Sequence, residues 1–138
     1  MNGYPDIREL VPHAGPMVLL DALVRWAPGE AECRFVVRAE QPFVRDGRMD
    51  TAATIEHMGQ AIAACLGYEA FRGGEGVKVG VIIGCRRLDL HVPALQVGDQ
   101  GTVVARRKRG HEEMSQFECE VRCGDRVVSS ADLTVYHA

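Results

Sequence analysis

The most constraining feature of this chain is one stretch, residues 51–71, that is apolar around nearly its whole circumference when drawn as a helix. The apolar positions are Ala52, Ala53, Ile55, Met58, Ala61, Ile62, Ala63, Ala64, Cys65 and Leu66. A helix that is apolar on all sides is buried on all sides. Because 138 residues make one domain, the remainder of the chain has to wrap around this helix.

That remainder is expected to be strands. Residues 30–40 alternate apolar and charged side chains, and residues 17–26 precede them across a Pro28-Gly29 turn, which predicts an antiparallel hairpin. After a loop at Gly73–Gly76 come five further expected strands, at residues 77–83, 86–92, 101–109, 114–123 and 126–136. Residues 41–50 are expected to form a polar loop and residues 93–99 a turn, while Gly84 indicates a bulge or kink.

This order of elements predicts an α+β hotdog fold, in which a curved antiparallel sheet of five or six strands wraps around one long central helix. We found no repeat or linker, so residues 1–138 are expected to form a single domain. Such a sheet leaves an edge strand unpaired, and joining the edges of two domains removes that liability. We therefore expect a dimer, either of identical chains or with a paralogous chain.

Composition excludes several classes of function. The net charge is −3, which argues against general nucleic-acid binding, and no stretch approaches the ~20 apolar residues of a membrane span. The five cysteines form no C-x-x-C pair, and no His, Cys and Asp set has metal-ligand spacing, so neither a metal nor another cofactor is expected. The first residues lack a basic region and an apolar run, which favours a cytoplasmic protein with reduced thiols.

Glu56 is the first candidate for chemistry, because it stands in the first two turns of the apolar helix between Ile55 and Met58. A buried carboxylate without a partner is costly, so its presence favours acid–base chemistry. The alternative is a charge favoured by the helix macrodipole, or a side chain that points out through a gap in the sheet.

Other candidates lie on or near the same helix. Gln60, one turn on, could bind Glu56 or a substrate, or it could be a buried amide satisfied by backbone. The N–H groups at the helix start, at Thr51 and Ala52, could polarise a thioester carbonyl if they are unpaired. We count Gly80, in the strand after the helix, among the substrate-binding candidates as well.

His13 lies between Pro12 and Pro16 in a stiff loop, which could aim its imidazole for proton transfer. A loop histidine is otherwise usually plain surface. Lys78, Arg86 and Arg87 form a basic cluster that would suit a carrier protein or coenzyme phosphates at a tunnel mouth, although charge runs are usually solvated strand ends.

Three segments together resemble the β-hydroxyacyl-acyl-carrier-protein dehydratases. Residues 10–21 (LVPHAGPMVLLD) resemble the family's LPHR-P-hLLhD segment. Residues 55–64 (IEHMGQAIAA) resemble its helix segment, hEAhAQ. Residues 91–99 (HVPALQVGD) resemble its Pro-x-x-x-Gly-Asp turn. The likeness is strongest to the small dehydratase subgroup of aryl-polyene-type biosynthetic clusters. That subgroup reads IEYMAQAIAA on the helix and LLGTRRxxxHVP afterwards, which resembles IIGCRRLDLHVP at residues 82–93.

The resemblance implies a lyase that removes water from a 3-hydroxyacyl group on an acyl carrier protein, in fatty-acid or polyene-type biosynthesis. Glu56 matches the helix carboxylate that handles the leaving hydroxyl. The family's second group, a histidine in a G-H-F-P segment that takes the C2 proton, has no counterpart in residues 41–50 (QPFVRDGRMD). His13 could replace it, a paralogous partner subunit could supply it, or the chain could be a supporting subunit with little activity.

An acyl-thioesterase that uses Glu56 to activate water is the alternative enzyme. In the dehydratase hypothesis, the N–H groups near Thr51 and Ala52 polarise the thioester carbonyl, and the chain works as a dimer with itself or with a paralogous dehydratase.

Overall fold

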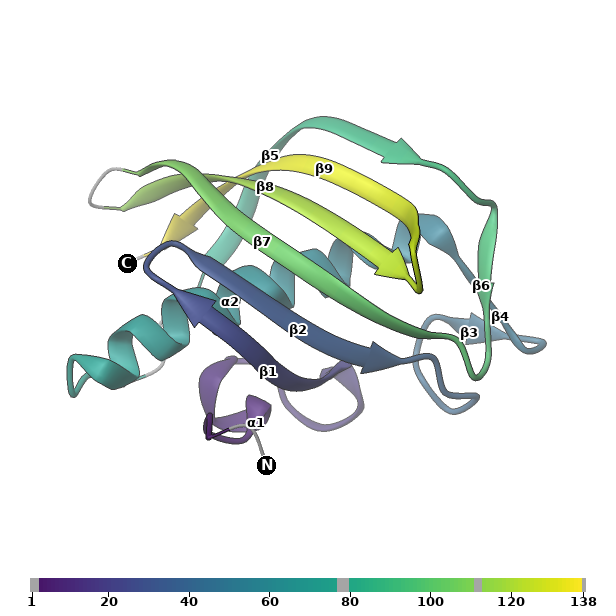
Figure 1. Ribbon diagram of the computed structural model, residues 1–138, viewed down its shortest axis with the longest axis horizontal. Helices are drawn as coiled ribbons and strands as arrows, with labels where there is room; N and C mark the ends of the chain where they lie inside the picture. Colours follow the sequence, from purple (N-terminus) through teal and green to yellow (C-terminus); the bar gives the residue numbers. More distant parts are fainter. Residues whose placement is uncertain (1–2, 77–79, 111–112, 138) are drawn as a thin grey trace.

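The computed structural model describes residues 3–76, 80–110 and 113–137, and its main feature is a curved antiparallel sheet that faces one long helix (Figure 1). The six strands lie in the order β1-β2-β7-β8-β9-β5. Their bounds are β1 Leu20–Ala27, β2 Glu30–Val36, β7 Gln100–Gly110, β8 Met114–Cys123, β9 Arg126–His137 and β5 Gly80–Leu90. The helix α2 spans Thr54–Arg72. This is the hotdog architecture that the sequence predicts.

Side chains that alternate along the strands fill the space between sheet and helix. On β2, Ala31, Cys33 and Phe35 are fully buried, as the period-two pattern requires. Phe117 on β8 belongs to the same core cluster, which also includes Met58 of α2. The apolar helix therefore lies against the inner face of the sheet, as expected.

The start of the long helix differs in detail from the expectation. Thr51–Ala53 form a short 3₁₀ helix, η2, and α2 begins at Thr54. The Asp50 carboxylate caps this end by accepting a hydrogen bond from Ala52 N at 2.9 Å. At the other end, Gly73 is the C-cap and Gly74 has a φ of 76°, which glycine adopts without strain.

Short strands were missed by the sequence pattern. Residues 41–50 are not only a loop, because they contain β3 (Val44–Arg45) and β4 (Arg48–Asp50), and the expected turn at residues 93–99 contains β6 (Ala94–Gln96). These three strands form a second small sheet at one end of the molecule (Figure 1). Strands of two or three residues are too short to show a period of two.

The strand after the helix also differs from the expected pair. Residues 80–90 form one continuous strand, β5, with register shifts between Ile82 and Gly84 and between Cys85 and Arg87. Gly84 thus marks a bulge rather than a strand boundary. Residues 77–79, where the first of the two strands was expected to begin, lie outside the described residues.

The N-terminal segment packs against the helix and carries the loop with His13. It contains α1 (Ile7–Leu10) and η1 (Gly15–Met17). Gly67 allows the close approach of α1, since a Cβ there would lie 2.0 Å from the Leu10 carbonyl oxygen. Within the described residues, no helix is both long and apolar enough to cross a membrane.

The edge strand β5 is unusually apolar for an exposed element. Large hydrophobic side chains along it remain exposed, namely Val81, Ile82, Ile83, Leu88 and Leu90. β5 pairs with β9 on one side only. An apolar edge of this length is a surface that needs a partner.

Candidate active site

Gln60 joins the helix to the N-terminal segment. Its side chain is fully buried, its Oε1 accepts a hydrogen bond from Leu19 N at 2.9 Å, and its Nε2 donates to the Met17 carbonyl at 2.6 Å. The same Nε2 lies 3.4 Å from Glu56 Oε1. Of the two interpretations of Gln60, the buried amide satisfied by backbone describes its main contacts, and these fix the chain just after the loop that holds His13.

His13 and Glu56 meet in space. His13 Nε2 lies 3.4 Å from Glu56 Oε1, and the two side chains are 26% and 27% exposed. The helix supplies the carboxylate, and the loop bracketed by Pro12 and Pro16 supplies the imidazole. The distance is longer than a good hydrogen bond. Glu56 is thus half-buried and open on one side, rather than enclosed in the core.

The pair stands beside a cavity of about 250 Å³ whose other walls are mainly apolar. The helix lines the cavity with Gly59, Ile62, Ala63 and Leu66, and the sheet lines it with Gly80, Val81, Ile82 and Val135. The structure therefore brings three candidates, Glu56, His13 and Gly80, to one cavity. An apolar pocket with a few convergent polar groups is the usual form of a small-molecule site.

The amides at the helix start do not take part in this cavity as expected. Thr51 N donates to the Pro93 carbonyl at 3.2 Å, and Ala52 N donates to Asp50 Oδ1 at 2.9 Å. The expectation that these two amides are unpaired is wrong, because the Asp50 cap and the segment before β6 already satisfy them. Neither residue lines the cavity beside Glu56.

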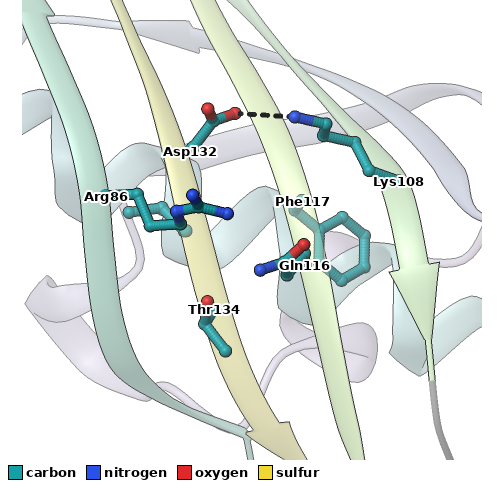
Figure 2. Close-up of a pocket in the computed structure, with 7 residues that line it drawn as sticks. Arg86, Lys108, Gln116, Phe117, Asp132 and Thr134 are labelled. Carbon is teal, nitrogen blue, oxygen red and sulfur yellow. Dashed lines mark ion pairs between the residues drawn. The ribbon is translucent and has the colours of Figure 1, made fainter.

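Two residues of the predicted carrier-protein patch, Arg86 and Arg87, lie on strand β5. Arg87 pairs with Asp132 on the face of the sheet turned away from α2, and it also binds Asp89. Figure 2 shows Arg86 reaching from β5 across β9, with the helix behind the sheet and the ion pair between Lys108 and Asp132 nearby. Neither Arg86 nor Arg87 lines the cavity beside Glu56. Lys78 lies outside the described residues.

His57, next to Glu56 in the sequence, faces the core instead of the cavity. It is 1% exposed, and its ring lies 4.6 Å from that of Phe35. Burial lowers the pKa of His57 to about 4, against a smaller opposing effect of the Ala53 carbonyl. It is therefore a neutral core residue. Among the described residues, no three His, Cys, Asp or Glu side chains converge to hold a metal ion.

The fold and the site together define a class, namely hotdog-fold proteins with a histidine and a carboxylate at an apolar cavity. The chain belongs to the ApeP-like family, described as ApeP dehydratase, which matches residues 5–138. It is therefore a member of a dehydratase family, as the resemblance of its three segments indicated.

Three solved structures share this fold. The dehydratase heterocomplex ApeI:P from Xenorhabdus doucetiae has 26% identity and a TM-score of 0.92, over 98% of this chain and 92% of that chain. The conserved protein PA5202 from Pseudomonas aeruginosa has 24% identity and a TM-score of 0.72, over 97% and 100%. A hypothetical thioesterase with coenzyme A from Streptococcus pneumoniae has 12% identity and a TM-score of 0.64, over 85% and 84%. The last two show the fold alone. No curated protein sequence matches this chain.

Proposed function

We propose that this protein removes water from 3-hydroxyacyl thioesters on acyl carrier protein and forms trans-2-enoyl thioesters, in fatty-acid or polyene-type biosynthesis. The observation that carries the proposal is the approach of His13 Nε2 to Glu56 Oε1 at 3.4 Å, beside an apolar cavity of about 250 Å³. Membership of a dehydratase family supports the reaction type. Eliminating water needs a base for the C2 proton and an acid for the C3 hydroxyl, and two adjacent groups can serve two adjacent carbons.

In this mechanism, His13 Nε2 accepts the proton from C2, and the Glu56 carboxylic acid gives its proton to the hydroxyl on C3. The C3–O bond breaks, water leaves, and the electron pair of the former C–H bond forms the double bond between C2 and C3. The imidazolium and the carboxylate that remain lie 3.4 Å apart. A proton can therefore return from His13 to Glu56, which restores both groups for the next turnover.

The apolar walls of the cavity suit the acyl chain. Ile62, Leu66 and Val135 offer only hydrocarbon to a ligand, so the chain would be held by burial of apolar surface. Gly80 lines the opposite wall and has no side chain, which lets a ligand approach the backbone of β5. We keep Gly80 as a substrate-binding residue on this ground.

We infer that the complete enzyme contains a second, paralogous dehydratase chain. The exposed apolar edge of β5 needs a partner, and Gly80, Val81 and Ile82 on this strand line the cavity. Because the amides of Thr51 and Ala52 are already bonded, the donor that polarises the thioester carbonyl has to come from elsewhere. A partner at the β5 edge is well placed to supply it. The similar structure from X. doucetiae is a heterocomplex by its description.

The proposal is tested by incubating the chain, alone and with its paralogous partner, with 3-hydroxyacyl thioesters on carrier protein. Enoyl thioester without release of the carrier thiol is the expected product. Thiol release without enoyl formation would identify a thioesterase instead. Activity of the assembled pair that survives Glu56→Gln would make this chain a supporting subunit.

A further inference from the structure

Two buried hydroxyl groups join the start of the long helix to the sheet. Thr54 is the first residue of α2, Ser129 lies on β9, and both residues are fully buried. Their oxygens, Thr54 Oγ1 and Ser129 Oγ, lie 2.7 Å apart. Thr54 Oγ1 also donates a hydrogen bond to the Thr51 carbonyl oxygen at 2.7 Å. Because a hydroxyl has only one proton to donate, the Ser129 hydroxyl has to be the donor to Thr54.

Stability alone gives little reason for this pair. An internal hydrogen bond adds little net stability, because the same groups bind water in the unfolded chain. Valine at position 54 and alanine at position 129 would replace both hydroxyls and leave neither partner unpaired. The Thr51 carbonyl would keep a partner as well, since the Thr54 N–H also donates to it. What the hydroxyls add to apolar packing is a fixed distance and angle between helix and sheet.

The location of Glu56 makes this fixed geometry useful. Glu56 lies in the first turn of α2, two residues after Thr54. The N–H groups of a first turn have few acceptors within the helix itself, so contacts outside the helix decide how firmly this turn is held. The Asp50 cap lies within the same segment of chain. The Thr54–Ser129 pair instead connects the turn to β9, the strand whose Val135 lines the cavity.

We propose that Thr54 and Ser129 are positioning residues that hold Glu56 within reach of His13 and of a substrate hydroxyl in the cavity. The inference rests on the proposed function, because it takes Glu56 as the acid for the C3 hydroxyl. Neither Thr54 nor Ser129 lines the cavity, so both act through the helix. A displacement of about 1 Å in a reacting group can lower a rate about 100-fold. The apolar walls would still bind the acyl chain, so KM should not change.

The test measures kcat, KM and melting temperature in variants of the assembled enzyme with a 3-hydroxyacyl thioester. Thr54→Val leaves the Ser129 hydroxyl buried and unpaired, so it should lower the melting temperature by about 3–10 °C and also lower kcat. Thr54→Val combined with Ser129→Ala removes both hydroxyls. The melting temperature should then return to within about 2 °C of the wild type, while kcat stays about 10- to 100-fold low at unchanged KM. Thr54→Ser keeps the hydroxyl and should retain kcat.

Thr51→Val is the matched control, because it makes the same chemical change at the same end of the helix. The Thr51 side chain is also fully buried, but its hydroxyl has no hydrogen-bond partner among the described residues. Its removal should leave kcat unchanged and should not lower the melting temperature. An equal loss of kcat in Thr51→Val and Thr54→Val would overturn the inference. Recovery of kcat together with the melting temperature in the double variant would overturn it too, because the hydroxyls would then be only structural.

Hydrogen exchange separates this inference from the reaction itself. Amide exchange can be measured by NMR in the wild type and in the double variant of Thr54 and Ser129. The amides of the first two turns of α2 should exchange about tenfold faster in the double variant, and those of its last two turns should not change. If the wild type does not dehydrate the thioester but exchange differs in this way, the proposed function fails and the fixing of the helix start stands. Equal exchange in both proteins overturns the inference.

Discussion

His13 Nε2 faces Glu56 Oε1 at 3.4 Å, and the two side chains come from a proline-bracketed loop and from the first turn of a buried helix. The contact depends on a third residue, because Gln60 binds the backbone at Met17 and Leu19 and so fixes the end of the loop. The positions of Glu56 and His13 are thus determined by one helix and one amide. Each of these residues can be changed separately.

Glu56→Gln should lower the turnover of a 3-hydroxyacyl thioester by about 10²–10⁴-fold, because an amide cannot donate the proton that the leaving hydroxyl needs. Stability should change little, since the side chain is 27% exposed and its contacts to His13 and Gln60 are long. Steady-state assays of the assembled enzyme and thermal melts measure the two effects. Glu69→Gln, the same change on a more exposed part of the helix, is the control and should retain activity.

His13→Ala should cause a loss of similar size without a change in melting temperature, because His13 lies in a loop and is not part of the core. His91→Ala, which removes an exposed histidine, should have no effect. If the assembled enzyme keeps its activity without His13, the base for the C2 proton is a histidine of the partner subunit, and the mechanism with both groups in this chain is wrong.

Gln60→Met should affect both stability and catalysis. It removes the hydrogen bonds to Leu19 N and the Met17 carbonyl and leaves these buried backbone groups unpaired, which costs about 1–3 kcal/mol for each group. The loop with His13 would then be less well fixed, so kcat should fall more than the loss of folded protein explains. Urea unfolding together with assays corrected for folded fraction would show this. Gln116→Met, on the outer face of the sheet, is the control. If Gln60→Met lowers stability without lowering kcat, Gln60 has only a structural role.

Much of this fold could be predicted from the sequence, because the apolar helix and the alternation of residues 30–40 are long signals that one type of packing explains, although the strand itself ends at Val36. Glu56 could be identified as well, since a charge in an apolar helix is a local anomaly. No local sequence pattern predicts the contact between Glu56 and His13, because this contact depends on how Gln60 binds a segment that is distant in the sequence. The Thr51 amide was wrongly expected to be unpaired for the same reason, because its acceptor, the Pro93 carbonyl, is distant in the sequence.

The outer-face arginine provides a prediction about the carrier protein. Arg86 does not line the cavity and reaches over the face of the sheet that is turned away from the helix (Figure 2). Arg86→Ala should therefore change KM for a carrier-bound substrate by no more than about twofold, as expected for an exposed charge that does not line the cavity. Titrating the carrier concentration in steady-state assays tests this. A large rise in KM that is absent with a pantetheine substrate would instead locate the carrier on the outer face.

The buried histidine should make stability depend on pH. The unfolded chain binds a proton at His57 near pH 6.5, whereas burial lowers the pKa of the folded residue to about 4. Between these values the unfolded state binds more protons, so the free energy of unfolding falls as the pH is lowered from 6.5 to 4, by on the order of 3 kcal/mol in the limit. His57→Phe keeps an aromatic ring beside Phe35 but does not titrate. Urea unfolding at pH 7 and pH 4.5 should show a smaller difference for this variant than for the wild type, and an equal difference would assign the acid sensitivity to other groups.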